Sequence, residues 1–109
     1  MAKLIALYNP PQDAAAFDEH YINTHIPLAL TMPGVRSAQR NDGEIHTPNG
    51  PSPYHMVGIL NFDSMADLQA GLASPQGMAT VADLANFAGA GVTVLMFDDV
   101  ESVPAPQDA

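Results

Sequence analysis

A tyrosine and a histidine lie one helical turn apart in a stretch that is otherwise apolar on the same side. Tyr21 and His25 are four residues apart, so both would project from one face of a helix. An imidazole can take or give a proton near neutral pH, and a phenol can hydrogen-bond a ligand's phenol or carbonyl oxygen. We therefore predict His25 to be a general acid or base and Tyr21 to orient a substrate.

Both residues also have a structural interpretation. His25 lies just before Pro27, whose ring clashes with the carbonyl group of Asn23 and which lacks an N–H group for that bond. The imidazole could therefore bond a freed backbone carbonyl and lock a kink. Tyr21 could equally be a core side chain with a satisfied hydroxyl. The spacing leaves these alternatives open.

Other candidate residues lie at the ends of strand-like runs. Tyr8 and Tyr54 are predicted to line the mouth of a substrate pocket, although packing alone would also explain them. His55 follows Tyr54, and strand parity does not decide whether it points into a barrel or toward the helices.

No metal or nucleotide cofactor is expected. His20 and His25 are five residues apart, which places them on diverging sides of a helix, whereas a metal pair needs a spacing of three or four. The glycines show no phosphate-binding spacing after a strand.

An amphipathic helix must position the candidate base. Asp13 is placed to cap it, Pro27 predicts a kink or a restart within it, and Gly34 follows its end. Phe17 and Leu28 are expected to bind substrate as apolar walls beside Tyr21. The inward stripe of the helix is predicted to consist of Phe17, Tyr21, His25, Leu28 and Met32.

Four strand-like runs and a second helical region complete the pattern. Strands are predicted at 3–8, 35–40, 54–62 and 92–97, with a mobile, turn-rich hairpin loop at 41–53. Ser64 begins a helix, and Ser74 restarts it. The second segment is predicted to face inward with Met78, Val81, Ala82, Ala85 and Phe87. The order βαββαβ predicts a ferredoxin-like α+β fold, with helices on one face of a four-stranded antiparallel sheet.

The strands are apolar on both faces. In the first strand Leu4 and Ala6 alternate with Ile5 and Leu7, and the third and fourth strands behave alike. Helices can bury only one face, and a monomer rarely exposes a large apolar patch. We therefore expect a homodimer in which two sheets pack face to face and enclose an apolar pocket for a small organic ligand.

Composition narrows the possible partners. The chain has 109 residues, of which 47% are hydrophobic and 14% charged, and its net charge is −9. Three basic residues cannot form a basic stripe, so no nucleic-acid or anionic-membrane partner is expected. No apolar run approaches the roughly 20 residues that span a bilayer. We expect a cytoplasmic protein with one domain at 1–100 and an acidic, proline-containing tail at 101–109.

The first helical region resembles the signature helix of the EthD family. EthD-like proteins belong to the dimeric α+β barrel superfamily, whose strand order is similar to the one inferred above. The family takes its name from an ether-degradation locus in which such a protein accompanies an oxygenase system. Wider relatives include monooxygenases on polycyclic phenols, polyketide cyclases and muconolactone isomerases. The resemblance lies in Phe17, Tyr21, Thr24, His25, Pro27, Leu28 and Ala29, followed by Pro33 and Gly34.

We hypothesise a small enzyme, or a catalytic accessory to an oxygenase, that acts on a small apolar aromatic or carbonyl compound by proton transfer. His25 would draw a proton from a phenol or from the carbon next to a carbonyl, without a cofactor. Cofactor-free oxygenation and isomerase-like or cyclase-like chemistry are variants. Two alternatives stay open: a binding or carrier module for a hydrophobic metabolite, and a structural or regulatory dimer.

Overall fold

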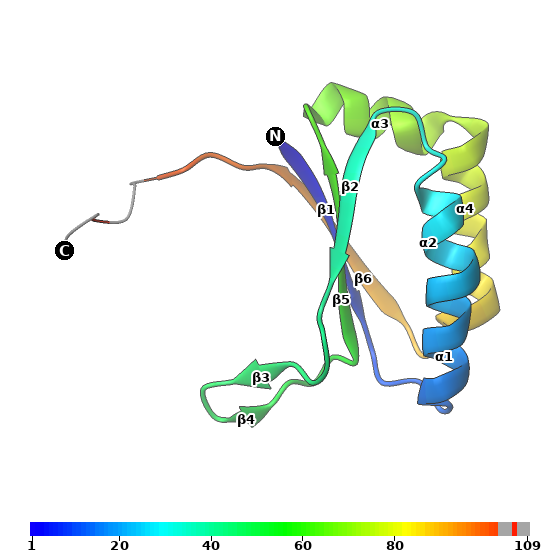
Figure 1. Ribbon diagram of the computed structural model, residues 1–109, viewed down its shortest axis with the longest axis vertical. Coiled ribbons are helices and arrows are strands. Elements are labelled where there is room, and N and C mark those ends of the chain that lie inside the picture. Colours follow the sequence, from blue (N-terminus) through cyan, green and yellow to red (C-terminus); the bar gives the residue numbers. More distant parts are fainter. Residues whose placement is uncertain (103–105, 107–109) are drawn as a thin grey trace.

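The computed structural model describes residues 1–102 and 106 and has two layers, a four-stranded antiparallel sheet and a layer of helices on one of its faces (Figure 1). The strand order in this sheet is β2-β5-β1-β6. This confirms the predicted ferredoxin-like α+β fold. The predicted tail at 101–109 stays untested, because residues 103–105 and 107–109 lie outside the described residues. The elements are β1 (Ala2–Tyr8), α1 (Ala14–His20), η1 (Tyr21–His25), α2 (Ile26–Ala29), β2 (Val35–Arg40), β3 (His46–Thr47), β4 (Gly50–Pro51), β5 (Met56–Phe62), α3 (Met65–Ala73), α4 (Pro75–Phe87) and β6 (Val92–Asp98).

The central strand β1 pairs along its whole length with β5 on one side and with β6 on the other. Its odd-even alternation decides which side chains meet the helices. Residues 2, 4, 6 and 8 are buried beneath the helix layer, whereas 3, 5 and 7 are half-buried on the opposite face. The same alternation in β5 adds Met56, Leu60 and Phe62 to the core.

The first helical region is three consecutive elements rather than one kinked helix. Asp13 caps α1 by accepting a hydrogen bond from the backbone N–H of Ala16, at 3.0 Å. The next turn, η1, is a π-helix, in which the backbone N–H of Ile26 bonds the carbonyl of Tyr21. The α-helix resumes as α2, with Pro27 in its first turn, where a proline is tolerated. The predicted restart is therefore confirmed.

The π-helical turn changes which residues face the core. In an α-helix, residues four apart drift by about 40° around the axis, because each residue turns about 100°. A π-helical turn contains an extra residue and offsets this drift. Phe17, Tyr21, His25 and Ala29 are consequently all buried on one face. Leu28, which the spacing predicts to point inward, is only half-buried, and Ala29 lies in its place.

The inward face of α4 differs from the sequence prediction. Met78, Val81, Ala82 and Ala85 are exposed, whereas the helix buries residues 77, 80 and 83. Close packing of α3 and α4 explains this orientation, because a Cβ atom at Gly77 would collide with the carbonyl oxygens of the last turn of α3. Gly77 therefore faces α3. Of the residues predicted to face inward, Phe87 is half-buried and packs against the core, as does Leu84.

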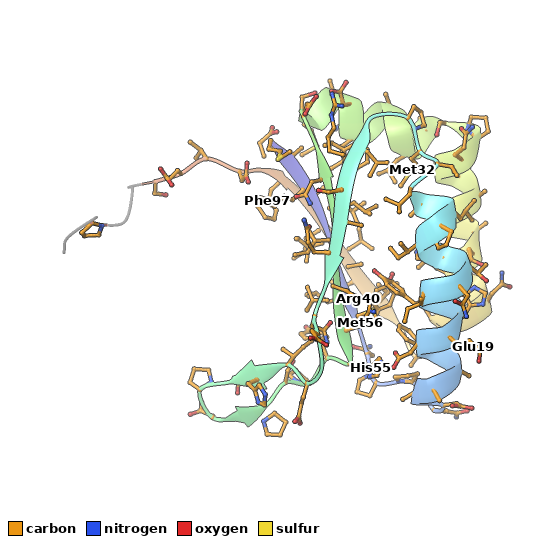
Figure 2. The ribbon with its side chains drawn as sticks, in the orientation of Figure 1. Glu19, Met32, Arg40, His55, Met56 and Phe97 are labelled. Atoms are coloured by element: carbon orange, nitrogen blue, oxygen red, sulfur yellow. The ribbon has the colours of Figure 1, made fainter. Side chains whose placement is uncertain are left out.

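The face of the sheet opposite the helices is apolar and open. Ile5, Leu7 and Val57 are half-buried there. Leu95 and Phe97 of the edge strand β6 are 49% and 44% exposed, and Figure 2 shows Phe97 on this open side. The loop between β2 and β5 contains the small hairpin β3–β4, which projects away from the sheet (Figure 1). In the described part of the chain, no helix is long and apolar enough to cross a membrane.

Candidate functional site

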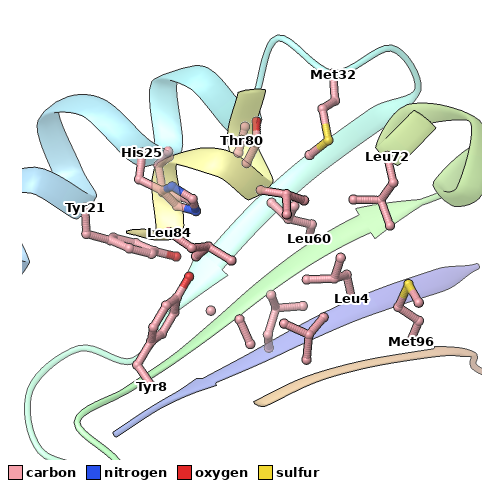
Figure 3. Close-up of a pocket in the computed structure, with 17 residues that line it drawn as sticks. Leu4, Tyr8, Tyr21, His25, Met32, Leu60, Leu72, Thr80, Leu84 and Met96 are labelled. Atoms are coloured by element: carbon pink, nitrogen blue, oxygen red, sulfur yellow. The ribbon is translucent and has the colours of Figure 1, made fainter. Parts of the chain in front are cut away.

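An apolar pocket lies between the sheet and the helix layer of the single chain (Figure 3). Its volume is about 250 Å³. The walls come from β1, β5 and β6 below and from η1, α2, α3 and α4 above. This cavity lies within one chain, and the expected pocket between two paired sheets stays a prediction. The space exists because Val94 and Met96 of the edge strand are 43% and 47% exposed and are not fully covered by a helix.

The pocket lining is almost entirely hydrocarbon. Of its 17 residues only Tyr8, Tyr21, His25 and Thr80 carry polar side-chain atoms, and none is a lysine, arginine, aspartate or glutamate. The Thr80 hydroxyl already donates a hydrogen bond to the carbonyl oxygen of Gln76, at 2.8 Å. The other three are left to meet a ligand. Such a pocket favours a neutral, mostly apolar molecule, because a charge buried here would have no partner.

The three remaining polar side chains gather at one end of the pocket, which we call the polar end: Tyr8, Tyr21 and His25. Figure 3 shows them together, with Met32, Leu72 and Met96 toward the opposite, apolar end. The ring centroid of Tyr21 lies 5.8 Å from that of Tyr8 and 5.7 Å from that of His25. Two phenols and one imidazole can therefore reach the same small ligand group.

Both phenols are hydrogen-bond donors at neutral pH. Burial raises the pKa of Tyr21 to about 12, and burial together with the nearby Tyr21 and Asp83 raises the pKa of Tyr8 further. Gly58 of β5 leaves the space that the Tyr21 hydroxyl occupies, since a Cβ atom there would lie 2.6 Å from that oxygen.

His25 is held by a carboxylate behind the pocket wall. Its Nδ1 atom lies 2.9 Å from Oδ2 of Asp83. A carboxylate only accepts hydrogen bonds, so Nδ1 carries the proton and donates it, and Nε2 retains a free lone pair. Burial lowers the pKa of His25, although the hydrogen bond and charge of Asp83 oppose this shift. His25 is therefore neutral at pH 7 and can accept a proton at Nε2.

Asp83 is the hub of a buried hydrogen-bond network. The residue is 7% exposed, and it accepts hydrogen bonds from His25, from Nε2 of His20 at 3.0 Å and from Nδ2 of Asn86 at 2.9 Å. Burial alone would raise the pKa of Asp83, but these hydrogen bonds outweigh it and lower the pKa below its ordinary value. The carboxylate is thus ionised and can offset a positive charge on His25.

The predicted divergence of His20 and His25 is wrong, because both rings reach Asp83. The π-helical turn between them brings residues five apart closer in direction than an α-helix would. The ring nitrogens of both histidines point at the carboxylate of Asp83 rather than at a shared space that a metal ion could occupy. Among residues 1–102 and 106, no three or more histidine, cysteine, aspartate or glutamate side chains are grouped so that they could hold a metal ion.

Three of the six predicted site residues line the pocket, namely Tyr8, Tyr21 and His25. Phe17 is buried behind them, with its ring edge-on to Tyr8 at 5.2 Å, and Leu28 lies outside the lining because Ala29 takes its place. Tyr54 borders a separate polar hollow beside the loop at 41–53.

His55, whose direction the sequence leaves open, borders this second hollow as well. Its Nε2 atom is bonded to Oδ1 of Asp18 at 2.8 Å, and its ring lies edge-on to Phe17. It therefore points toward the helix layer without lining the apolar pocket.

Sequence reasoning missed Asp83, the residue that orients the candidate base. A signal was present, because Gly77, Thr80 and Asp83 recur every three residues along α4. A carboxylate flanked by apolar residues on a helix is a candidate partner for a histidine on another apolar face. The apolar residues Met78 and Val81 predict a different inward face for α4, so this pattern does not stand out in the sequence.

The comparisons with known proteins agree with this fold. The EthD domain matches residues 9–91. An 11.0 kDa protein encoded in the thcB–thcC intergenic region of Rhodococcus erythropolis is 39% identical over 104 residues, covering 95% of this chain and all of that protein. The crystal structure of an ethyl tert-butyl ether D (EthD) family protein from Bacillus halodurans is similar, with 36% identity, a TM-score of 0.83 and coverage of 92% of this chain and 99% of that one.

More distant structures share the fold alone. A mutant of SnoaB, a cofactor-independent oxygenase from Streptomyces nogalater, has 12% identity and a TM-score of 0.66, and the match covers 95% of this chain and 97% of that one. A dimeric protein with a ferredoxin-like fold from Bacteroides fragilis has 14% identity and a TM-score of 0.62, with coverage of 90% and 95%. With its matching domain, its close relatives and its fold taken together, the chain belongs to the EthD family.

Proposed function

We propose that this protein binds a small, neutral aromatic or carbonyl compound in the apolar pocket and transfers a proton at its polar end. The observation that carries the proposal is the buried His25–Asp83 pair, which opens on a pocket that is otherwise hydrocarbon apart from two phenols and the hydroxyl of Thr80. A neutral imidazole backed by a carboxylate is well suited to general base catalysis, because the carboxylate orients the ring and offsets the charge that it acquires.

The proton balance can be followed atom by atom. Nε2 of His25 takes a proton from a phenol or from the carbon next to a carbonyl, and the electron pair of the broken bond stays on the substrate. The resulting phenolate or enolate oxygen accepts hydrogen bonds from the hydroxyls of Tyr8 and Tyr21. Asp83 offsets the charge of the imidazolium. Returning the proton to another atom of the substrate completes an isomerisation and regenerates the base.

The same intermediate suits a second reaction class. An enolate or phenolate is electron-rich, and cofactor-free oxygenation of such a substrate is a variant of this proposal. The likeness to SnoaB concerns the fold alone. An oxygenase system as partner and a cytoplasmic location also stay predictions.

A second copy of the chain is proposed to cover the open face of the sheet. Ile5, Leu95 and Phe97 on that face would otherwise contact water, and a similar fold occurs in the dimeric Bacteroides fragilis protein. Burial of apolar area contributes roughly 25 cal/mol per Å² before the costs of association. Sedimentation of the full chain at micromolar concentration is expected to give the mass of a dimer, and a monomer would contradict this part of the proposal.

The proton-transfer proposal can be tested without knowing the natural substrate. Small aryl ketones and apolar diketones are incubated with the protein in D₂O, and exchange of the proton next to the carbonyl is followed by NMR. The wild-type protein is expected to accelerate exchange. His25→Gln should stay folded, and its exchange rate should be at least about 100-fold lower than that of the wild type.

His46→Gln is the matched control, because His46 is exposed in the hairpin β3–β4. A panel member that raises the melting temperature and is recovered without exchange would instead support the binding-module alternative. Acceleration that survives in His25→Gln would remove His25 from the reaction.

A further inference from the structure

Two histidines of different exposure share the carboxylate of Asp83. The side chain of His25 is 7% exposed and faces the pocket, whereas that of His20 is 26% exposed on the far side of Asp83. Oδ2 of Asp83 accepts from both, at 2.9 Å from Nδ1 of His25 and 3.0 Å from Nε2 of His20. The pocket base is thus connected through one carboxylate to a ring that water can reach.

His20 is held firmly in this position. Its ring stacks on Phe87 with a centroid distance of 5.0 Å and an angle of 20° between the planes. The ring of Phe87 also contacts that of His25, at a centroid distance of 4.7 Å. His20 borders a shallow hollow on the outer surface, so it can exchange protons with solvent even when a ligand fills the pocket.

The charges around the two rings are few. The described titratable groups that face His25 are Tyr21 of its own turn, Tyr8 of β1 and Asp83 of α4. His20 faces Asp83 and shares the outer hollow with Asp13, while Asp18 and Glu19 precede it on α1. Asp83 is therefore the only described carboxylate bonded to both rings.

One negative charge can offset one imidazolium well, but not two. A proton on His20 would use the charge of Asp83 and would repel a proton on His25. In agreement with this, burial lowers the pKa of His25, Asp83 raises it, and the charge of His20 lowers it again. Neither phenol can replace the carboxylate, because both stay neutral.

We propose that His20 is a positioning residue for the pocket base: it shares Asp83 from the solvent side, and a positive charge on its ring opposes protonation of His25, which keeps His25 free to act as a base. His20 touches no ligand in this arrangement and acts only through Asp83. The catalytic consequence rests on the proposed function, whereas the coupling between the two rings does not.

The test is an NMR titration of the His25 ring in the full chain, compared between the wild type and His20→Gln. Glutamine keeps an N–H donor for Asp83 but never carries a charge. We expect the titration midpoint of His25 to rise by roughly half a pH unit or more in His20→Gln, because a repelling cation is removed. An unchanged or lower midpoint would overturn the proposal.

Two further measurements secure this result. His20→Asn also removes the ring charge and should raise the midpoint of His25 in the same direction, so it serves if His20→Gln does not fold. His55→Gln is the matched control, because His55 pairs with Asp18 rather than Asp83 and should leave the His25 midpoint unchanged.

The titration needs no substrate, so it can succeed even if the aryl ketone assay shows no catalysis. If exchange is catalysed, the acid limb of kcat/KM should move to higher pH in His20→Gln, because His25 then becomes protonated, and lost as a base, at higher pH. A catalysed reaction with an unmoved acid limb would retain the proposed function and overturn the role of His20.

Discussion

The two ends of the pocket are built in different ways. At the polar end, His25 is fixed by Asp83, and Tyr8 and Tyr21 are packed against each other and against Phe87. The apolar end is formed by flexible side chains, among them Met32 and Met96, which can adopt several rotamers. The difference indicates that the polar side chains are held in one geometry, whereas the apolar walls can adjust their shape. Substitutions at the two ends should therefore have separable effects.

The largest effect is expected from Asp83→Asn. The amide cannot offset an imidazolium charge, and it no longer requires the proton of His25 to reside on Nδ1. Proton exchange of an aryl ketone should fall about 100-fold. Asp18→Asn is the control, because Asp18 bonds His55 instead, and its rate should match the wild type. A wild-type rate in Asp83→Asn would show that the carboxylate is not part of the polar end.

Gly58→Ala should disturb the polar end from the sheet side. The added Cβ atom would lie 2.6 Å from the Tyr21 hydroxyl, so the phenol must move. The free energy of unfolding in urea should fall by about 1–3 kcal/mol. Gly89→Ala has open space around its added atom and should change stability by less than about 0.5 kcal/mol. Equal stability of the two variants would mean that Tyr21 is not fixed as described.

The pH dependence of stability should also report on the polar end. The pKa of His25 is lowered from 6.5 in the folded protein, so below pH 6.5 the unfolded chain binds a proton that the folded chain does not. Unfolding is then favoured, and the melting temperature should fall as the pH drops from about 7 toward about 5. His25→Gln should show a weaker decline over this range. Identical slopes in calorimetry would argue against a buried, neutral His25.

The smallest effect is expected at the apolar end, from Met96→Leu. The two side chains have similar volumes, so the affinity for an apolar ketone should change by less than about tenfold, as calorimetric titration would measure. The NMR midpoint of His25 should not move at all. A shifted midpoint would show that the two ends are coupled rather than independent.

Local patterns in the sequence predict much of this fold. The apolar runs of the strands and the caps at Asp13, Ser64 and Ser74 depend on neighbouring residues only, and the structure contains these strands and caps. The orientation of α4 depends instead on the close approach of Gly77 to α3, which no periodicity reveals. The periodicity therefore predicts the inward position of Phe87 correctly, whereas Met78, Ala82 and Ala85 are exposed instead of buried.

The candidate site also combines residues that local patterns predict with residues that only long-range contacts reveal. Helical spacing and strand ends predict that His25, Tyr21 and Tyr8 surround the pocket. The same spacing places Leu28 there as well, because α-helical periodicity does not include the extra residue of the π-helical turn at Tyr21–His25. Asp83 was missed because its importance depends on two residues that are about sixty positions away in the chain.

The π-helical turn also determines how much room a ligand has. If residues 21–25 returned to α-helical hydrogen bonding, α2 would rotate by about 100° relative to α1. Leu28 would then replace the small Ala29 against the cavity, and its longer side chain would fill part of the space. The volume of the pocket is therefore limited by the path of the backbone. A relative with a regular α-helix here would accept smaller ligands even with the same side chains.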